Sequence, residues 1–350
     1  MPLIDCQTSA DRVNFEGALT SDEVDALVAD PKLKVLQTAK PSDSKTWELL
    51  SSHFFSVRPN VELRIYGHYQ SSCDLAFLAH LPNLRRFSAD CLIKATGVEH
   101  IARLAELEHL SVGIYSLDSF DFLLELNPDR LTHLSLGATF SKKPGLRALE
   151  RFRGIENLYI EGQSKDIEVV GTLKCLQDLT LRSITVPSLG FLINLPRLWS
   201  LDIKLGGTTN LSELAYLTRV KYLELWQIKG LCDLSPIAKM VGLQFLFLQS
   251  LRNVERLPDL SRLTALRRVI VENMKGLNDL STLAAAPALE EFLYISAQRR
   301  EPKQFAELLA KGNLKRMLVG FGSARKNAEI EEMQKAAGVA SYTHHPFQYA

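Results

Sequence analysis

The stretch Val220-Lys221-Tyr222-Leu223-Glu224-Leu225-Trp226-Gln227 decides the fold. It places aliphatic residues at offsets 0, 3 and 5, with polar or aromatic residues between them. A single run of this kind occurs by chance, but this one recurs along most of the chain. Its six-residue core starts at Leu84, Leu107, Leu131, Ile155, Leu176, Leu198, Val220, Leu243, Leu266, Leu289 and Leu314, at intervals of 21 to 25 residues. A near-constant period of this length indicates structural repeats that stack on one another.

The pattern L-x-x-L-x-L at this period resembles the leucine-rich repeat family. The short units are similar to those of bacterial internalins and of a type-1 phosphatase regulatory subunit, which indicates a bacterial origin. The resemblance implies an α/β solenoid with a curved parallel sheet on its concave face and short α or 3₁₀ turns on its convex face. It implies about eleven regular repeats and one or two degenerate N-terminal ones. The family's asparagine, eight residues past each start, is replaced by residues such as Ile184, Gly206, Ile228 and Leu251, so an asparagine ladder is not expected.

The ends of the chain depart from the regular repeat, as end units do when they shield a stack from water. We expect an N-terminal cap with a degenerate repeat over residues 1–58, repeats over 59–320 and a C-terminal cap over 321–350, all in one continuous domain. Within the first cap, Val13-Asn14-Phe15 predicts a strand, and the acidic turn at Ser21-Asp22-Glu23 predicts a helix through Val28. In the last cap, residues 324–337 predict an amphipathic helix.

Charge and composition narrow the function. The 350 residues carry a formal net charge of +1, whereas nucleic-acid or membrane-surface binding usually requires a basic face. The first residues, MPLIDCQTSA, show no basic stretch followed by an apolar run, and no segment is apolar for long enough to span a membrane. The five cysteines, an odd and widely spaced set, favour free thiols. These features predict a cytoplasmic protein, and they are equally compatible with delivery into a host by another secretion route.

Residues between the aliphatic positions are expected to line the concave face, because side chains alternate along a strand. Equivalent residues of successive repeats then form columns with a spacing of about 4.8 Å. In the middle repeats these columns combine aromatic and charged residues, which is the composition of protein-binding hot spots. The predicted partner-binding residues are Tyr159, Glu161, Arg182, Trp199, Asp202, Lys204, Tyr222, Glu224, Trp226, Phe245, Phe247 and Gln249.

The last repeats place an aliphatic strip on the same face, made of Ile270, Leu293, Ile295, Leu318 and Phe321. An exposed strip of this kind requires a cover. We expect the tail, which carries Tyr342, Phe347 and Tyr349, to supply it. The alternative is a homodimer through Ile270, Leu293, Ile295 and Leu318, which would make the chain a self-associating structural protein.

Chemical functions are less favoured by the sequence. Asp202 and Glu224 are neighbours in one column, close to the separation of about 5 Å between the carboxylates of retaining glycosidases, so a glycan-binding or hydrolytic site is a lesser alternative. Arg182 and Lys204 are expected to neutralise the two carboxylates. His109 and His133 occupy adjacent repeats without a third metal ligand in their column. The prediction is therefore a protein-binding module with no catalytic residue, metal or cofactor.

Overall fold

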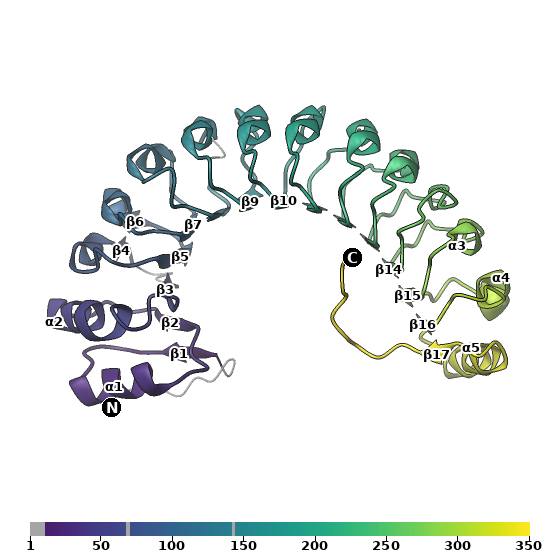
Figure 1. The fold of residues 1–350 in the computed structure, drawn as a ribbon, viewed down its shortest axis with the longest axis horizontal. Coiled ribbons are helices and arrows are strands. Elements are labelled where there is room, and N and C mark those ends of the chain that lie inside the picture. Colours follow the sequence, from purple (N-terminus) through teal and green to yellow (C-terminus); the bar gives the residue numbers. More distant parts are fainter. Residues whose placement is uncertain (1–10, 68–70, 142–143) are drawn as a thin grey trace. The chain divides into compact units, whose positions relative to one another are not determined.

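The computed structural model describes residues 11–67, 71–141 and 144–350. It forms two compact units, residues 1–176 and 177–350, which are described separately (Figure 1). The N-terminal residues considered above for a signal sequence, and Cys6 among them, lie outside the described residues. Among the described residues, no helix is long and apolar enough to cross a membrane.

The first unit builds a parallel sheet whose strands follow one another in sequence order. Its strands are β1 (Arg12–Asn14), β2 (Val35–Thr38), β3 (Glu62–Tyr66), β5 (Arg86–Leu92), β7 (His109–Ile114), β8 (His133–Leu136) and β9 (Asn157–Glu161). A separate pair joins β4 (Cys73–Asp74) to β6 (Ala95–Thr96). The connections hold α1 (Ser21–Ala29), α2 (Ser44–Leu49), a π-helical turn (Leu50–Phe55) and 3₁₀ helices over Ala76–His80, Val98–Arg103, Asp121–Glu125, Arg147–Arg151 and Ile167–Thr172.

The second unit continues the same alternation of strand and short turn. Its strands are β10 (Asp178–Arg182), β11 (Ser200–Lys204), β12 (Tyr222–Trp226), β13 (Phe245–Gln249), β14 (Arg268–Glu272), β15 (Glu291–Ile295), β16 (Arg316–Val319) and β17 (Ala340–Ser341). All of the neighbouring pairs from β10 to β17 are parallel. The connections hold 3₁₀ helices over Gly190–Asn194, Ser212–Tyr216, Ser235–Lys239 and Pro302–Phe305, and the helices α3 (Thr282–Ala285), α4 (Ala306–Leu309) and α5 (Ala324–Ala336).

The recurring aliphatic residues form the core of each unit. A strand begins two residues after each predicted start, from Leu84 to Leu314, and the second and third aliphatic positions of the run lie on it. In β12, for example, Leu223 and Leu225 are fully buried, while Tyr222 and Trp226 are half-buried on the other face. The expected strand at Val13, the helix from Ser21 and the helix from Ala324 are confirmed. The fold prediction is confirmed in its parallel sheet and its 3₁₀ turns.

The turn out of β5 and of each strand from β9 to β15 uses a left-handed residue, one position before the site of the family's asparagine. Leu205, Gln227, Ser250 and Asn273 have φ angles of +50° to +57°. Their N–H groups donate to the backbone carbonyl that ends the next strand, as in Gln227 N to Gln249 O at 2.8 Å. The following residue is buried and apolar in several repeats, as at Ile228, Leu251 and Met274, at the position where the family has asparagine, whereas Gly206 is half-buried there. Backbone groups therefore satisfy one another along this edge, and in these repeats an apolar side chain fills the site.

Repeats approach one another closely on their way back to the sheet. A Cβ atom on Gly242 would lie 2.2 Å from the backbone oxygen of Thr218 in the preceding repeat. That distance is far below any van der Waals contact, so this position requires glycine. Three of the cysteines are free thiols, as the sequence predicted: Cys73 is buried, and Cys91 and Cys232 are exposed.

Candidate binding surface

The open face, defined as the side of each sheet opposite the 3₁₀ turns, carries the predicted columns. In the second unit, strand register aligns three of them. The first column is Asp178, Ser200, Tyr222, Phe245, Arg268, Glu291 and Arg316; the second is Thr180, Asp202, Glu224, Phe247, Ile270, Leu293 and Leu318; the third is Arg182, Lys204, Trp226, Gln249, Glu272 and Ile295. Ten of the twelve predicted partner-binding residues belong to this unit, and all but Trp199 stand in these columns; Trp199 directly precedes β11.

An acidic pair lies at the centre of this face. The Lys204 ammonium is 3.6 Å from Asp202 Oδ1 and 3.2 Å from Glu224 Oε2. The Tyr222 hydroxyl donates to Glu224 Oε2 at 2.7 Å, and the Thr180 hydroxyl donates to Asp202 Oδ2 at 3.2 Å. The sequence predicted neutralisation of the pair, and Lys204 provides it. Thr180, Tyr222 and Lys204 engage part of the pair, whereas Asp202 Oδ1 is buried and accepts no hydrogen bond from the described residues.

The surroundings of Asp202 favour its protonated form. Burial raises the pKa of Asp202 to about 7, the nearby Lys204 charge opposes that rise, and the Glu224 carboxylate adds to it. Burial and the hydrogen bond to Glu224 likewise raise the pKa of the Tyr222 phenol.

Aromatic rings flank the acidic pair on the third and second columns. The Arg182 guanidinium lies 5.5 Å from the centre of the Trp226 ring, a cation–π contact. Trp226, Phe247 and Gln249 are all half-buried and follow one another across β12 and β13. This side of the face presents large apolar rings beside charges, as the sequence predicted.

The C-terminal tail, residues 342–350, lies across the first column of the same unit. In Figure 1 the yellow segment leaves β17 and runs back on the open side of the sheet. The Tyr349 ring meets the Trp199 ring edge-on at 5.0 Å, and the Phe347 ring lies 5.3 Å from Phe245. The Arg267 guanidinium lies 4.8 Å from the centre of the Phe347 ring. Two tail rings thus cover two residues that the sequence assigned to partner binding.

Hydrogen bonds hold the tail along the same edge. The Ala350 N–H donates to Gln244 Oε1 at 2.9 Å, and the Lys221 ammonium donates to the Ala350 backbone oxygen at 2.5 Å. Arg267 donates to the backbone oxygen of Gln348. Burial raises the pKa of the Tyr349 phenol to about 12. These partners precede the strands by one residue, outside the columns from which the sequence prediction was drawn.

A buried ion network anchors the start of the tail. Arg268 and Glu291 are 4% and 5% exposed, and Arg268 Nε lies 2.5 Å from Glu291 Oε2. Glu291 also contacts Arg316 and, at 2.9 Å, the His345 ring. Burial alone raises the pKa of Glu291, but the hydrogen bonds and charges of Arg268 and Arg316 outweigh it and hold that pKa below its ordinary value.

The aliphatic strip is smaller than the sequence predicted. Leu293 and Phe321 are buried, at 5% and 2% exposure, and Phe321 packs on Phe305 with ring centres 5.9 Å apart. Ile270 and Leu318 are half-buried, and Ile295 is 38% exposed. The ring contacts and hydrogen bonds of the tail are with Trp199, Phe245, Arg268 and their neighbours, and cover of the strip by the tail stays a prediction.

The remaining two predicted residues lie in the first unit. The Tyr159 hydroxyl donates to Glu161 Oε2 at 2.8 Å. Both line a hollow of about 590 Å³ on the open face of that unit, whose floor includes Gly113 and Gly137. The structure places them with the small residues of their own unit.

The stacked histidines of the first unit form a hydrogen-bonded row. The Arg86 guanidinium donates to His109 Nδ1 at 2.7 Å, and His133 Nε2 lies 3.0 Å from Asn157 Nδ2. Burial, together with the charge of Arg86, lowers the pKa of His109 to about 4. Among the described residues, no group of three or more His, Cys, Asp or Glu side chains is placed to hold a metal.

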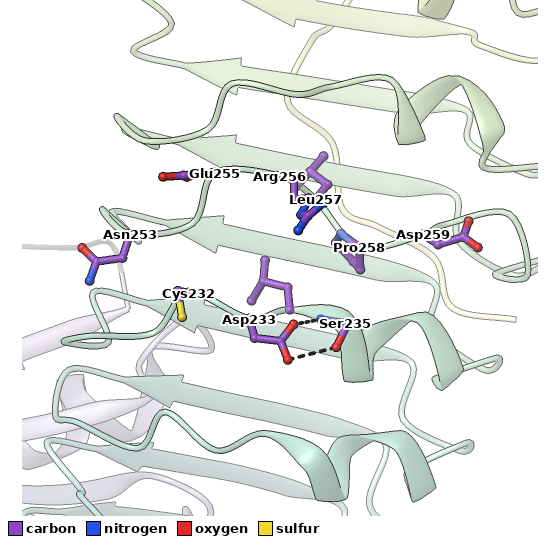
Figure 2. Close-up of a pocket in the computed structure, with 10 residues that line it drawn as sticks. Cys232, Asp233, Ser235, Asn253, Glu255, Arg256, Leu257, Pro258 and Asp259 are labelled. Carbon is purple, nitrogen blue, oxygen red and sulfur yellow. Dashed lines mark hydrogen bonds between the residues drawn. The ribbon is translucent and has the colours of Figure 1, made fainter.

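A cavity of about 510 Å³ lies away from the open face, on two successive connecting loops of the second unit (Figure 2). Figure 2 shows the Asp233 carboxylate facing Ser235, whose N–H donates to it at 2.8 Å and whose hydroxyl donates at 3.0 Å. The same aspartate-to-serine bond recurs at Asp259 with Ser261 and at Asp279 with Ser281. These carboxylates satisfy the N–H groups at the start of each turn, so their role is structural.

Strands and turns alternate in both units with a period of 21 to 25 residues, and the sequence repeats L-x-x-L-x-L in step with them. Each unit is a leucine-rich repeat solenoid. No family model matches the chain, and no curated protein is found to be similar to it.

Solved structures with a similar course of the chain include two internalins and a leucine-rich repeat protein. Internalin C2 of Listeria monocytogenes is 21% identical over 63% of this chain and 83% of its own, with a TM-score of 0.40. An internalin of the same species, InlF, is 16% identical over 96% of this chain and 87% of its own, with a TM-score of 0.48. A leucine-rich repeat protein of Leptospira interrogans is 17% identical over 93% of both chains, with a TM-score of 0.44.

Proposed function

We propose that the chain is a non-catalytic module that binds a protein partner on the open face of its second unit. The observation that carries the proposal is the row of half-buried rings, Trp226 and Phe247, beside the charged group of Arg182, Lys204 and Asp202. Large rings next to charges contribute most of the binding energy in protein interfaces. A face that is already ordered by its strand ladder loses little conformational entropy when a partner docks.

Self-association and glycan hydrolysis are weaker candidates. The strip that would pair two copies is reduced to Ile295 and two half-buried residues, which is a small apolar area for a stable dimer. Tyr222 and Thr180 donate hydrogen bonds to the acidic pair and Lys204 forms an ion pair with it, so a glycan would have to compete with these groups.

The test is affinity capture with the purified full-length chain, followed by titration of the captured partner. Replacement of Trp226 by alanine is expected to weaken binding on the order of tenfold or more, as truncation of a central aromatic anchor does. The side chain lies on the open face, so circular dichroism and the unfolding midpoint should remain near those of the unaltered chain. A W226A chain that binds the same partner with unchanged affinity would contradict the assignment.

A further inference from the structure

The tail lies on the second unit in the manner of a bound peptide. The strand β17, which directly precedes the tail, pairs with β16 through Ala340 and Ser341. The N–H of Tyr342, the first tail residue, still donates to Met317 O at 3.2 Å. Beyond that point its contacts come from successive repeats, from Glu291 back to Trp199. The segment therefore crosses the strands and is held mainly by side chains of the sheet.

The side chains of the tail alternate between the sheet and the solvent. His345, Phe347 and Tyr349 contact the repeats, whereas His344, Pro346 and Gln348 are exposed. An alternation of two residues is that of an extended chain. Pro346 favours this conformation, since it has a fixed φ and holds the residue before it in the extended region.

The repeats supply a distinct contact for each inward residue. Trp199 receives the Tyr349 ring, and Phe245 with Arg267 receives the Phe347 ring. Arg268 and Glu291 receive His345, with Arg268 Nη2 at 2.8 Å from His345 Nε2. Lys221, Gln244 and Arg267 bind backbone groups of the tail, which any peptide possesses.

The tail is also the kind of segment that can leave. It is held by two rings, by the contacts of His345 with Arg268 and Glu291, and by a few hydrogen bonds to side chains, and Tyr349 remains 37% exposed. Segments with few buried contacts open at a small fraction of the cost of global unfolding. A tethered segment nevertheless competes at an effective concentration on the order of millimolar, which a free peptide must overcome.

We propose that the surface formed by Trp199, Phe245, Arg267 and Arg268 binds extended peptide segments that present two aromatic side chains separated by one residue, and that residues 342–350 occupy it until such a segment of a protein partner displaces them. This inference rests on the proposed protein-binding function. It adds the class of segment that is recognised and the reason why the unaltered chain binds it weakly.

The test uses a fluorescent peptide with the sequence of residues 342–350, Tyr-Thr-His-His-Pro-Phe-Gln-Tyr-Ala, titrated against the full chain by anisotropy. A chain with the substitutions F347A and Y349A retains every repeat but has a weakened tail. We expect it to bind the peptide on the order of tenfold more tightly than the unaltered chain does, because the competing rings are gone. The control peptide carries alanine at both aromatic positions and should bind neither chain.

Two further variants distinguish the surface under the tail from the surface of the proposed function, which includes Trp226. W199A in the weakened-tail chain should lose peptide binding about tenfold, because the edge-on ring contact is removed. W226A in the same background should bind the peptide normally, since Trp226 stands in the third column. Equal peptide binding by the unaltered and weakened-tail chains, or binding of the alanine peptide, overturns the inference. The partner titration with W226A tests the proposed function independently.

Discussion

The two edges of the open face in the second unit differ in cover. Along the first column, under the tail, Arg268 and Glu291 are 4% and 5% exposed, although both are charged. Along the third column Lys204, Trp226 and Gln249 are half-buried, and Ile295 is 38% exposed. The open face thus has a closed edge, the first column under the tail, and an available edge, the third column, where side chains are partly exposed. The comparison shows that exposure on a repeat face is decided by segments outside the repeats as well as by the repeats.

The largest expected effect on stability comes from the closed edge. Glu291→Ala leaves the buried Arg268 guanidinium without its carboxylate, and breaking a buried pair in this way costs about 3 kcal/mol of unfolding free energy. Urea unfolding monitored by circular dichroism measures the loss. The matched control is Glu272→Ala on the third column, where a change below about 0.5 kcal/mol is expected for a more accessible side chain. Similar losses in both variants would mean that the edges do not differ energetically.

The second prediction concerns the tail directly. In the chain with F347A and Y349A, the Trp199 indole loses its cover, so acrylamide should quench its fluorescence more strongly. Trp226 is replaced by phenylalanine in every chain of this experiment, so that its own quenching does not contribute. Trp47 can remain, because it is 3% exposed and contributes little quenching. The control is the substitution Q348A, an exposed tail residue whose backbone oxygen keeps its bond to Arg267. Identical quenching in all three chains would contradict the position of the tail.

A third prediction uses pH to examine the second column, between the two edges. Asp202 has a folded-state pKa of about 7, raised from 3.8, so the folded chain binds a proton that the unfolded chain has released between about pH 4 and pH 7. Ionisation of this group therefore lowers stability as pH rises through that window. Asp202→Asn removes this titration, and its unfolding midpoint should fall less between pH 5 and pH 8 than that of the unaltered chain.

The control for this pH series is Asp259→Asn. The N–H of Ser261 donates to Asp259 and lowers the pKa of its carboxyl, so this group contributes stability that is present above its unfolded pKa and is lost as pH falls through the folded value. Both the folded and the unfolded pKa of Asp259 lie at or below 3.8, so Asp259→Asn should leave the pH dependence between pH 5 and pH 8 as it is in the unaltered chain. An Asp202→Asn chain whose midpoint follows pH as the unaltered chain does would contradict the raised pKa of Asp202.

The smallest effect is expected where the chain turns out of the third column. Gln227 has φ of +51°, and a left-handed conformation costs an ordinary residue roughly 1–2 kcal/mol. Gln227→Gly relieves that cost but adds entropy to the unfolded chain, for a net gain of about 0.5 kcal/mol. Gln227→Ala keeps the strain and should give no gain. A less stable glycine variant would show that the Gln227 side chain is needed.

The sequence predicts the repeats well because each is specified locally. Leu223 and Leu225 are buried and Glu224 and Trp226 stand on the opposite face, as strand alternation requires. The same rule aligns Asp202 with Glu224 and Lys204 with Trp226. One period, read from the aliphatic residues alone, is sufficient for these assignments, whereas the boundaries of the terminal caps stay a prediction.

The cover of the first column follows no such rule. Ala350 bonds to Gln244 and Lys221 across more than one hundred residues of sequence, and no periodicity relates the tail to the repeats. The aromatic residues of the tail indicate that it does not remain free in solvent, but the course it takes depends on where Trp199 and Phe245 lie in space. The partners Arg267 and Gln244 lie just before the strands, so the alternation rule did not single them out.

The alternation within the tail gives it two independent sides. His344 and Gln348 are exposed, whereas the neighbouring residues His345, Phe347 and Tyr349 contact the repeats. A dye attached at position 344 or 348 would therefore move with the tail without disturbing these contacts. Release of the tail would then appear as a change in the mobility of the label in a single molecule. A label at position 344 or 348 would therefore report whether the tail is bound to the sheet or released from it.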